Sequence, residues 1–164
     1  NIGMSRFIKF RYWHEQLLRQ PYTKEVEDEL SQLYSLLVLD AVVEAPYIKG
    51  GLEFLKAYYQ KLPLFVASGT PEKELREIVK RRYMLLYFTG VFGSPASKTE
   101  ILKNIVRKYH YNPERVLMIG DTMADWKGAQ SAGTAFLGVR ISKNISALPE
   151  GIHLNDLLQL ENFI

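Results

Sequence analysis

The stretch VLMIGDTMADWKGAQSAG, residues 116–133, decides the fold of this 164-residue chain. Its first five residues are suited to a buried strand, and that strand ends directly at Asp121. A second carboxylate, Asp125, follows four positions later, at the start of a predicted helix over 124–133. A buried strand has no need of an acidic ending, whereas a metal site does. The stretch therefore predicts a strand–helix unit with a cation site at its junction.

The composition is that of a soluble globular chain, with 47% hydrophobic and 24% charged residues,. It predicts one compact domain with a small appendage. The absence of cysteine excludes disulfides, a thiolate nucleophile and thiolate metal ligands,. The three histidines, His14, His110 and His153, are scattered without ligand spacing. Oxygen ligands and a hard cation are therefore favoured for any metal site.

The net charge of +3 and the pI of about 9.0 describe a mild basic excess. Its densest run, Lys80–Arg82, continues a predicted helix and lacks interleaved aromatic residues, so we interpret it as a solvated face rather than a nucleic-acid site,. No apolar window reaches membrane-spanning length, and no signal-peptide pattern opens the chain,. We expect a cytoplasmic protein that binds neither nucleic acid nor membrane, with a targeting segment before Asn1 left open.

Residues 1–45 have helical periodicity, and the Pro- and Gly-containing segment 45–51 marks a boundary,. Beyond it, short apolar runs alternate with amphipathic segments. We expect strands at 62–68, 116–120, 134–141 and 152–154, and helices at 71–83, 98–110, 124–133 and 155–160. Such alternation predicts an α/β fold with a parallel, doubly wound sheet.

Several polar residues fall where the predicted strands end, which is where open α/β sheets bind ligands. The strand over 62–68 runs into Ser68, Gly69 and Thr70, and the segment 90–98 delivers Lys98 to the start of a helix. A hydroxyl and exposed backbone N–H groups donate to phosphate oxygens, and a lysine neutralises phosphate charge. The sequence therefore predicts a phosphate site.

The two carboxylates at the end of the strand over 116–120 complete this edge of the sheet. Asp121 and Asp125 suit Mg²⁺, which takes few protein ligands and keeps most of its waters,. Gly120 is expected to let the backbone turn sharply beside the cation. The sequence thus predicts a divalent cation beside a phosphate.

Each of these residues also has a simpler interpretation. Ser68 is a candidate turn residue or helix N-cap, and Lys98 a candidate surface lysine. Asp121 is a candidate cap for the following helix, and Asp125 a candidate for its solvated face. Their occurrence together at strand ends favours the functional interpretation.

Three segments carry a resemblance to a known family. The stretches FVASGTP (65–71), SPASKTEIL (94–102) and 116–133 resemble the second, third and fourth motifs of the haloacid dehalogenase superfamily of phosphohydrolases. The similarity covers nearly everything from Pro46 onward. The N-terminal GMSRFIKF resembles the middle of the α-helical cap in the phosphoglycolate-phosphatase-like branch, and residues 46–59 resemble the return from cap to core. The implied domains are a partial helical cap over 1–45 and a Rossmann-like core over 46–164.

The resemblance implies a role for each candidate residue. Ser68 would hydrogen-bond the transferring phosphoryl group, helped by backbone N–H groups near Gly69 and Thr70. Lys98 would stabilise the phosphate and an aspartyl-phosphate intermediate. Asp121 would bind Mg²⁺ directly, and Asp125 would bind it or orient it through water. The roles agree with what phosphoryl transfer needs, namely positioning and charge neutralisation.

The first motif of the family, an apolar strand ending in Asp-x-Asp that carries the nucleophile, is missing. The nearest candidate is Asp40, but Val42 stands two positions later and cannot transfer a proton, so we interpret this stretch as helix,. We expect that the chain begins partway through the cap and lacks a strand from inside the sheet. Buried backbone groups without partners cost about 1–3 kcal/mol each, against native stabilities of about 5–15 kcal/mol. A complementary N-terminal segment or a second chain is therefore expected to complete the sheet.

These observations predict a Mg²⁺-dependent phosphohydrolase of small phosphorylated metabolites, with little or no turnover by these 164 residues alone. Two alternatives stay open. One is a non-catalytic phosphate- or partner-binding module, and the other is a phosphomutase or a true dehalogenase. The paired acids at Asp121 and Asp125 argue against dehalogenation, which needs no metal.

Overall fold

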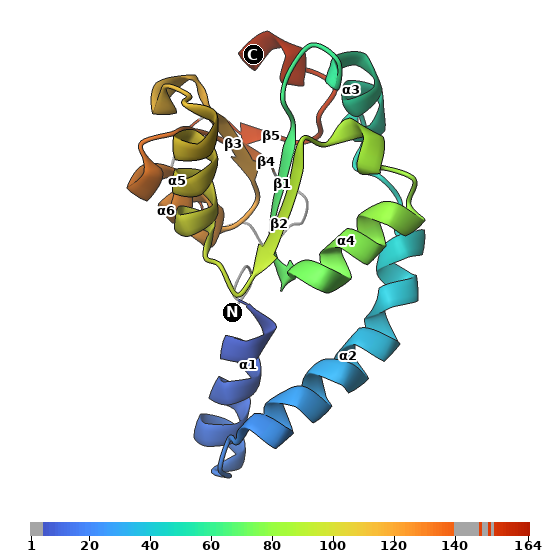
Figure 1. Ribbon diagram of the computed structural model, residues 1–164, viewed down its shortest axis with the longest axis vertical. Helices are drawn as coiled ribbons and strands as arrows, with labels where there is room; N and C mark the ends of the chain where they lie inside the picture. The colour runs from blue at the N-terminus through green and yellow to red at the C-terminus, as the bar shows by residue number, and fades with distance from the viewer. Residues whose placement is uncertain (1–4, 140–147, 149–150, 152) are drawn as a thin grey trace.

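The computed structural model describes residues 5–139, 148, 151 and 153–164. Helices α5 and α6 lie on one side of the strands and helices α3 and α4 on the other, while α1 and α2 extend away from them (Figure 1). The predicted α/β class with parallel strands is confirmed. None of the described helices is both long and apolar enough to cross a membrane.

The strands and helices alternate along the chain from residue 51 onward. The strands are β1 (Phe65–Pro71), β2 (Gly90–Ser94), β3 (Leu117–Gly120), β4 (Ala135–Val139) and β5 (His153–Leu154). The α-helices are α1 (Arg6–Tyr12), α2 (Lys24–Glu44), α3 (Gly51–Tyr58), α4 (Glu72–Arg81), α5 (Lys98–Tyr109) and α6 (Met123–Ala132). A π-helix spans Trp13–Leu18, and 3₁₀-helices span Leu85–Tyr87, Pro113–Arg115 and Leu160–Phe163.

The strands form two parallel sheets rather than one. Strand β1 pairs with β2, and β3 pairs with β4, which in turn pairs with β5. In the part of the chain that the structure describes, no ladder of hydrogen bonds joins β1 to β3. Helix α5 contacts both β1 and α6, and α6 packs on β3 and β4, so one helical layer spans both sheets. The sheet is therefore divided between β1 and β3.

The buried core is divided in the same way. Its three clusters are Leu75, Val79 and Val91; Leu102, Met118 and Ala129; and Leu137, Leu154 and Leu160. The first cluster lies between α4 and β2, and the others lie around β3 and β4. Among the described residues, each cluster thus belongs to one side of the division.

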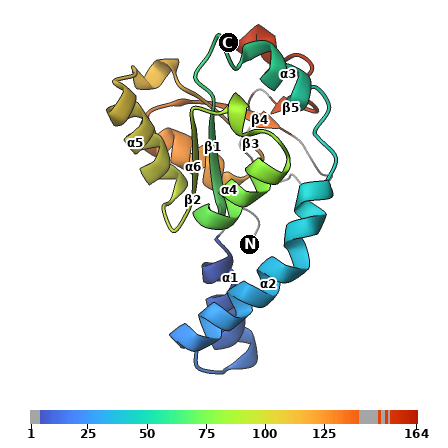
Figure 2. The ribbon, with the colours of Figure 1, turned by 45° about the vertical axis from the view of Figure 1, so that its right-hand side comes forward.

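Residues 5–45, here called the helical arm, contain α1, the π-helix and α2 and project from the sheets (Figures 1 and 2). The arm is attached to α4 through two arginines. Arg81 pairs with Asp40 at 2.8 Å. The Arg82 guanidinium lies 2.8 Å from each of three carbonyl oxygens at the end of α2, those of Val42, Val43 and Ala45. Because Arg82 caps α2, the interpretation of Lys80–Arg82 as a purely solvated face is wrong for this residue.

The helical interpretation of the stretch around Asp40 is confirmed, because Asp40 lies within α2. Its side chain is 74% exposed. Thr23 caps the start of α2, since its hydroxyl accepts a hydrogen bond from the Val26 amide at 3.4 Å.

Two predictions about the core differ from the structure. Strand β2 occupies part of the segment 90–98, where we expected no strand. The segment lacks a long apolar run, and two of the five residues of β2 are glycines. A side chain at Gly93 would place its Cβ 2.4 Å from the Thr70 carbonyl oxygen, so the glycine allows β1 and β2 to approach. The predicted helix over 155–160 is wrong. There the Asp156 carboxylate accepts the Leu158 amide at 3.0 Å and forms a turn that competes with a helix,.

Two further expectations fall partly outside the described residues. These are the ends of the predicted strands at 140–141 and at 152.

The Arg82 cap yields a stability prediction. We expect Arg82→Met to lower the free energy of unfolding by about 1–3 kcal/mol, because charge-assisted hydrogen bonds to three helix-end carbonyls are lost. Urea denaturation measures the change. The matched control is Arg107→Met on α5, whose exposed side chain bonds only Asn104 among the described residues. Equal effects of the two substitutions would contradict the role of Arg82 as a cap.

Candidate active site

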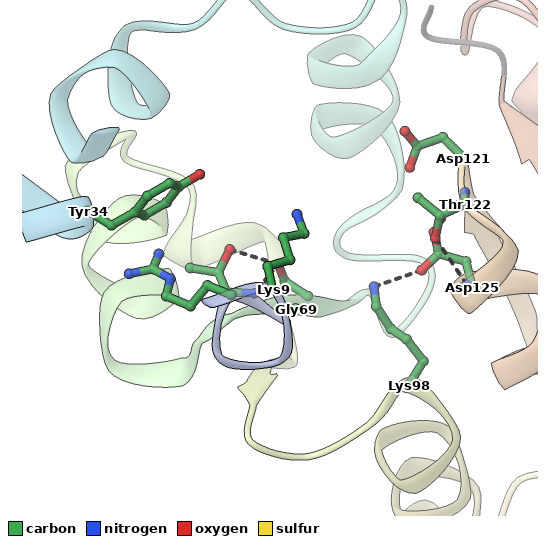
Figure 3. Close-up of a pocket in the computed structure, with 10 residues that line it drawn as sticks. Lys9, Tyr34, Gly69, Lys98, Asp121, Thr122 and Asp125 are labelled. Carbon is green, nitrogen blue, oxygen red and sulfur yellow. Dashed lines mark hydrogen bonds and ion pairs between the residues drawn. The ribbon is translucent and has the colours of Figure 1, made fainter. Parts of the chain in front are cut away.

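The ends of β1 and β3 open into one cavity of about 270 Å³ (Figure 3). Its lining consists of Arg6, Lys9, Tyr34, Ser68, Gly69, Thr70, Lys98, Asp121, Thr122 and Asp125. All the site residues that the sequence predicts are therefore brought together, although they come from distant parts of the chain.

The first wall is the end of β1. The regular register of β1 against β2 is interrupted between Ala67 and Pro71. Within this interruption the Ser68 Oγ accepts the Thr70 amide at 3.1 Å and donates to the Thr70 hydroxyl at 3.1 Å. Ser68 does not cap α4, whose N-cap is Pro71. The hydroxyls of Ser68 and Thr70 thus lie on a cavity wall in a local turn.

Lys98 connects the two sheets. Its Nζ donates to the Ala67 carbonyl oxygen of β1 and lies 2.8 Å from Asp125 Oδ1, beyond the end of β3. Its side chain is 16% exposed, so the alternative of an ordinary surface lysine is wrong. A capping box between Ser97 and Glu100 fixes the start of α5, where Lys98 is the first residue,.

Asp125 is fixed at the start of α6. Its Oδ2 accepts the Thr122 amide at 3.1 Å and the Thr122 hydroxyl at 2.7 Å, and the Thr122 Oγ1 accepts the Asp125 amide at 3.2 Å. Thr122, rather than Asp121, therefore caps this helix. Asp125 is buried and not on a solvated face. Its Oδ1 forms the ion pair with the Lys98 ammonium at 2.8 Å.

Two glycines bring these parts into contact. We expected Gly120 to permit a sharp turn of the backbone. Its φ is not positive, however, because the described glycines with positive φ are Gly50 and Gly133. Instead, a Cβ at Gly120 would lie 2.4 Å from Asp125 Cβ. A Cβ at Gly128 would likewise lie 2.7 Å from Lys98 Cβ. Both glycines therefore permit close approach around the Lys98–Asp125 pair.

Asp121 is half-buried on the opposite side of the cavity from Tyr34 (Figure 3). Burial raises the pKa of the Asp121 carboxyl, and the negative charge of Asp125 raises it further, while a backbone hydrogen bond and Lys98 oppose the change. Two carboxylates in a partly desolvated site favour a bound cation. The site therefore has unmet negative charge.

The residues present fit Mg²⁺. Asp121 carries this unmet charge, and Asp125 Oδ1 is a buried carboxylate oxygen 2.8 Å from the Lys98 ammonium. The described residues hold no group of three or more metal-binding side chains. Two carboxylates are nevertheless enough for Mg²⁺, which keeps several of its waters.

Sequence reasoning missed the wall that the helical arm contributes. Arg6 and Lys9 of α1 and Tyr34 of α2 line the same cavity. The available signal was the spacing of Arg6 and Lys9, which places both on one face of a helix. Only the folded arm shows that this face meets the strand ends.

The close approach at Gly120 gives a prediction. We expect Gly120→Ala to displace Asp125 from Lys98 and to lower the free energy of unfolding by about 1–3 kcal/mol, because an added methyl overpacks the site. The control is Gly151→Ala, where an added Cβ meets no atom of the described residues within 4 Å. Thermal unfolding compares the two variants. An unchanged free energy of unfolding for Gly120→Ala would show that the end of β3 can move to accommodate the added methyl.

The raised pKa of Asp121 predicts a pH dependence. The folded state holds this proton more tightly than the unfolded chain, so the stabilising contribution is complete below the unfolded pKa and is lost as the pH rises through the folded pKa,. At pH 7 without metal, Asp121→Asn should therefore unfold at a higher urea concentration than the parent, and the difference should vanish in acid.

Adding Mg²⁺ should raise the urea midpoint of the parent and leave that of Asp121→Asn unchanged. Asp40→Asn, at an exposed carboxylate, is the control and should respond to Mg²⁺ as the parent does. A Mg²⁺ response retained by Asp121→Asn would remove Asp121 from the proposed cation site.

Comparisons with known proteins place this geometry in a family. The model of the haloacid dehalogenase-like hydrolase family matches residues 7–139. A 5′-nucleotidase of Pseudomonas aeruginosa is 32% identical over 81 residues, which are 46% of this chain and 37% of that protein. The matched segment thus spans little more than a third of its curated relative.

Solved structures share the fold at low identity. A predicted phosphoglycolate phosphatase from Haemophilus somnus superposes with a TM-score of 0.80 at 17% identity, over 99% of this chain and 78% of the other. A hydrolase of the same family from Bacillus subtilis, described as bound to magnesium, gives 0.73 at 18% identity over 98% and 72%. With more than half of its length matched by the family model, this chain belongs to the haloacid dehalogenase-like hydrolases.

Proposed function

We propose that the protein containing this chain is a Mg²⁺-dependent phosphohydrolase that acts on small phosphorylated metabolites through an aspartyl-phosphate. The observation that carries the proposal is the bridge made by Lys98. Its ammonium joins the end of β1, which presents Ser68, to Asp125 beside Asp121. One cavity thereby holds both a set of phosphate-binding groups and a pair of cation-binding groups.

The phosphoryl group would bind at the end of β1. The Ser68 hydroxyl and the backbone N–H groups near Gly69 and Thr70 donate to its oxygens, and Lys98 neutralises its charge. These groups are held before substrate arrives, because the Lys98 side chain is fixed by Ala67 and Asp125. Such preorganised donors stabilise the charge that develops during phosphoryl transfer.

Asp121 and Asp125 would hold the cation. Asp121 is the carboxylate without an ion-pair partner among the described residues, and it would bind Mg²⁺ directly. Asp125, held by Thr122 and Lys98, would bind the cation beside it or orient it through water. When bound, Mg²⁺ supplies positive charge to the phosphoryl oxygens.

The nucleophile remains to be placed, and Asp40 is unsuitable. It lies on α2, pairs with Arg81 and is not part of the cavity lining. We propose that a carboxylate arrives on a strand between β1 and β3, supplied by a complementary N-terminal segment or by a second chain. The division of the sheet at this place supports the proposal, because the inserted strand would pair with both free edges,.

The helical arm supports a missing segment independently. Leu36 and Leu37 on α2 are 77% and 79% exposed, and Leu33 beside them is half-exposed. Burying such a stripe would stabilise the arm by roughly 25 cal/mol per Å² of apolar surface. We therefore propose that residues 1–45 are part of a helical cap and that residues 46–164 form a core in which the first strand is absent.

A second candidate function is a non-catalytic phosphate- or partner-binding module. It is favoured by the same division of the sheet, since the described residues place no carboxylate where a nucleophile would stand between β1 and β3. A phosphomutase uses the same groups, whereas a metal-free dehalogenase would leave the Asp121–Asp125 pair without a purpose.

Hydrolysis of p-nitrophenyl phosphate with Mg²⁺ tests the proposal. We expect little or no turnover by the 164-residue chain and robust, chelator-sensitive turnover by the natural protein that contains it. In that protein, Lys98→Met and Asp121→Asn should each lower kcat by roughly 100-fold or more, because preorganised charge is lost.

Asp40→Asn is the matched control and should retain activity. Robust turnover by the 164-residue chain that Asp40→Asn abolishes would instead assign Asp40 as the nucleophile. Phosphate binding without hydrolysis by the natural protein would favour the binding module.

A further inference from the structure

The end of β1 that presents the phosphate-binding groups is a bulge. The regular register of β1 against β2 stops at Ala67 and resumes at Pro71, so residues 68–70 stand opposite Gly93 of β2 alone. A bulge interrupts the ladder of backbone hydrogen bonds and re-aims the side chains that it carries. Contacts other than the ladder must therefore fix its shape.

Gly93 lies against the backbone beside this bulge. A Cβ at Gly93 would lie 2.4 Å from the Thr70 carbonyl oxygen, 2.6 Å from Glu72 Cα and 2.7 Å from Glu72 N. These three atoms belong to the backbone rather than to a flexible side chain, so a larger residue would have to displace the chain. The absence of a side chain at Gly93 thus sets how closely β2 approaches the end of the bulge.

Glu72 makes the hydrogen bond that joins the two segments. It is the first residue of α4, and its Oε2 accepts the Gly93 amide at 3.2 Å. Its Oε1 accepts Nε and Nη2 of Arg76 at 3.1 and 2.9 Å. The hydrogen bonds from Arg76 lower the pKa of the Glu72 carboxyl, burial opposes this change, and the Gly93 amide lowers the pKa further. Glu72 is therefore an ionised acceptor that Arg76 orients toward β2.

The effect of these contacts on the cavity passes through the bulge. Within the described part of the chain, the cavity lining includes Ser68 and Thr70 but neither Glu72 nor Gly93. The Ser68 Oγ accepts the Thr70 amide and donates to the Thr70 hydroxyl. A displacement of the Thr70 backbone would consequently move both hydroxyls that face the cavity.

We propose that Glu72 and Gly93 are positioning residues for phosphate binding. They hold residues 68–70 in the shape that makes the hydroxyls and backbone N–H groups converge on the phosphoryl group. The inference rests on the proposed function, which places the phosphoryl group at this bulge. Loss of either contact should weaken the binding of phosphate and leave the binding of a cation at Asp121 and Asp125 unchanged.

Calorimetric binding of inorganic phosphate to the natural protein that contains this chain, at saturating Mg²⁺, tests the inference. We expect Glu72→Ala to raise the Kd of phosphate by roughly tenfold, because about one hydrogen bond to a charged group is lost. Glu72→Gln should retain most of the affinity, because its amide oxygen still accepts the Gly93 N–H. Gly93→Ala should resemble Glu72→Ala, because the added methyl displaces the Thr70 backbone.

Two further variants of α4 separate positioning from a loss of stability. Glu77→Ala removes an exposed carboxylate from the same helix and should leave the Kd of phosphate unchanged. Ile78→Val removes a buried methyl group, so it should lower the urea midpoint without changing this Kd,. An equal rise in Kd for Ile78→Val and Glu72→Ala would mean that phosphate affinity follows stability, and it would overturn the inference.

Titration with Mg²⁺ supplies a readout that a general loss of structure would move. We expect the parent and Glu72→Ala to bind Mg²⁺ with the same Kd, because Asp121 and Asp125 follow β3 rather than β1. An equal loss of phosphate and Mg²⁺ binding contradicts the inference, and so does an unchanged Kd of phosphate in Glu72→Ala.

Failure of the proposed function has a different signature. A parent that binds phosphate but does not hydrolyse p-nitrophenyl phosphate would refute the phosphohydrolase proposal, and the Kd values would still decide the role of Glu72 and Gly93. A parent that binds no phosphate would overturn the proposed function and the inference together.

Discussion

The Lys98–Asp125 ion pair is the interaction on which the candidate site depends. It is buried, so both charges need a partner, and removal of either would leave an unpaired charge inside the protein,. The pair also spans the division of the sheet, because Lys98 bonds Ala67 of β1 while Asp125 follows β3. Because Gly120 and Gly128 have no side chain, Asp125 and Lys98 can approach closely enough to form this pair. This one electrostatic contact therefore holds the candidate phosphate-binding and cation-binding residues in place.

The divided sheet is the second constraint. Parallel strands need partners on both edges when they lie inside a sheet, and within the described residues β1 and β3 each have one partner strand,. The two halves keep separate buried clusters and are joined through the helical layer of α5 and α6 and through Lys98. A strand inserted between them would add hydrogen bonds to both edges and would end at the cavity. The same feature thus bears on stability and on the source of the nucleophile.

The helical arm adds a second wall to the strand-end site. Arg6 fastens α1 to α4 through Glu74, and Arg82 caps α2 from the end of the same helix. Helix α4 thereby holds the arm at α1 and at the C-terminal end of α2, and Lys9 and Tyr34 line the cavity. The position of this wall of the cavity is set by contacts of Arg6 and Arg82 that lie outside the strand ends.

The sequence alone determined the α/β class, most of the helices and the phosphate and cation candidates, because apolar periodicity and polar residues at strand ends are local signals. It did not reveal β2, whose glycines permit close contacts with neighbouring residues. It also predicted a sharp turn at Gly120, where the structure shows a close approach to Asp125 instead. It also predicted a helix over 155–160, where a side-chain turn competes successfully. Tertiary structure alone decided that Lys98 pairs with Asp125, that Thr122 caps α6 and that Lys9 faces the cavity. These outcomes depend on how distant elements pack, which no local pattern encodes.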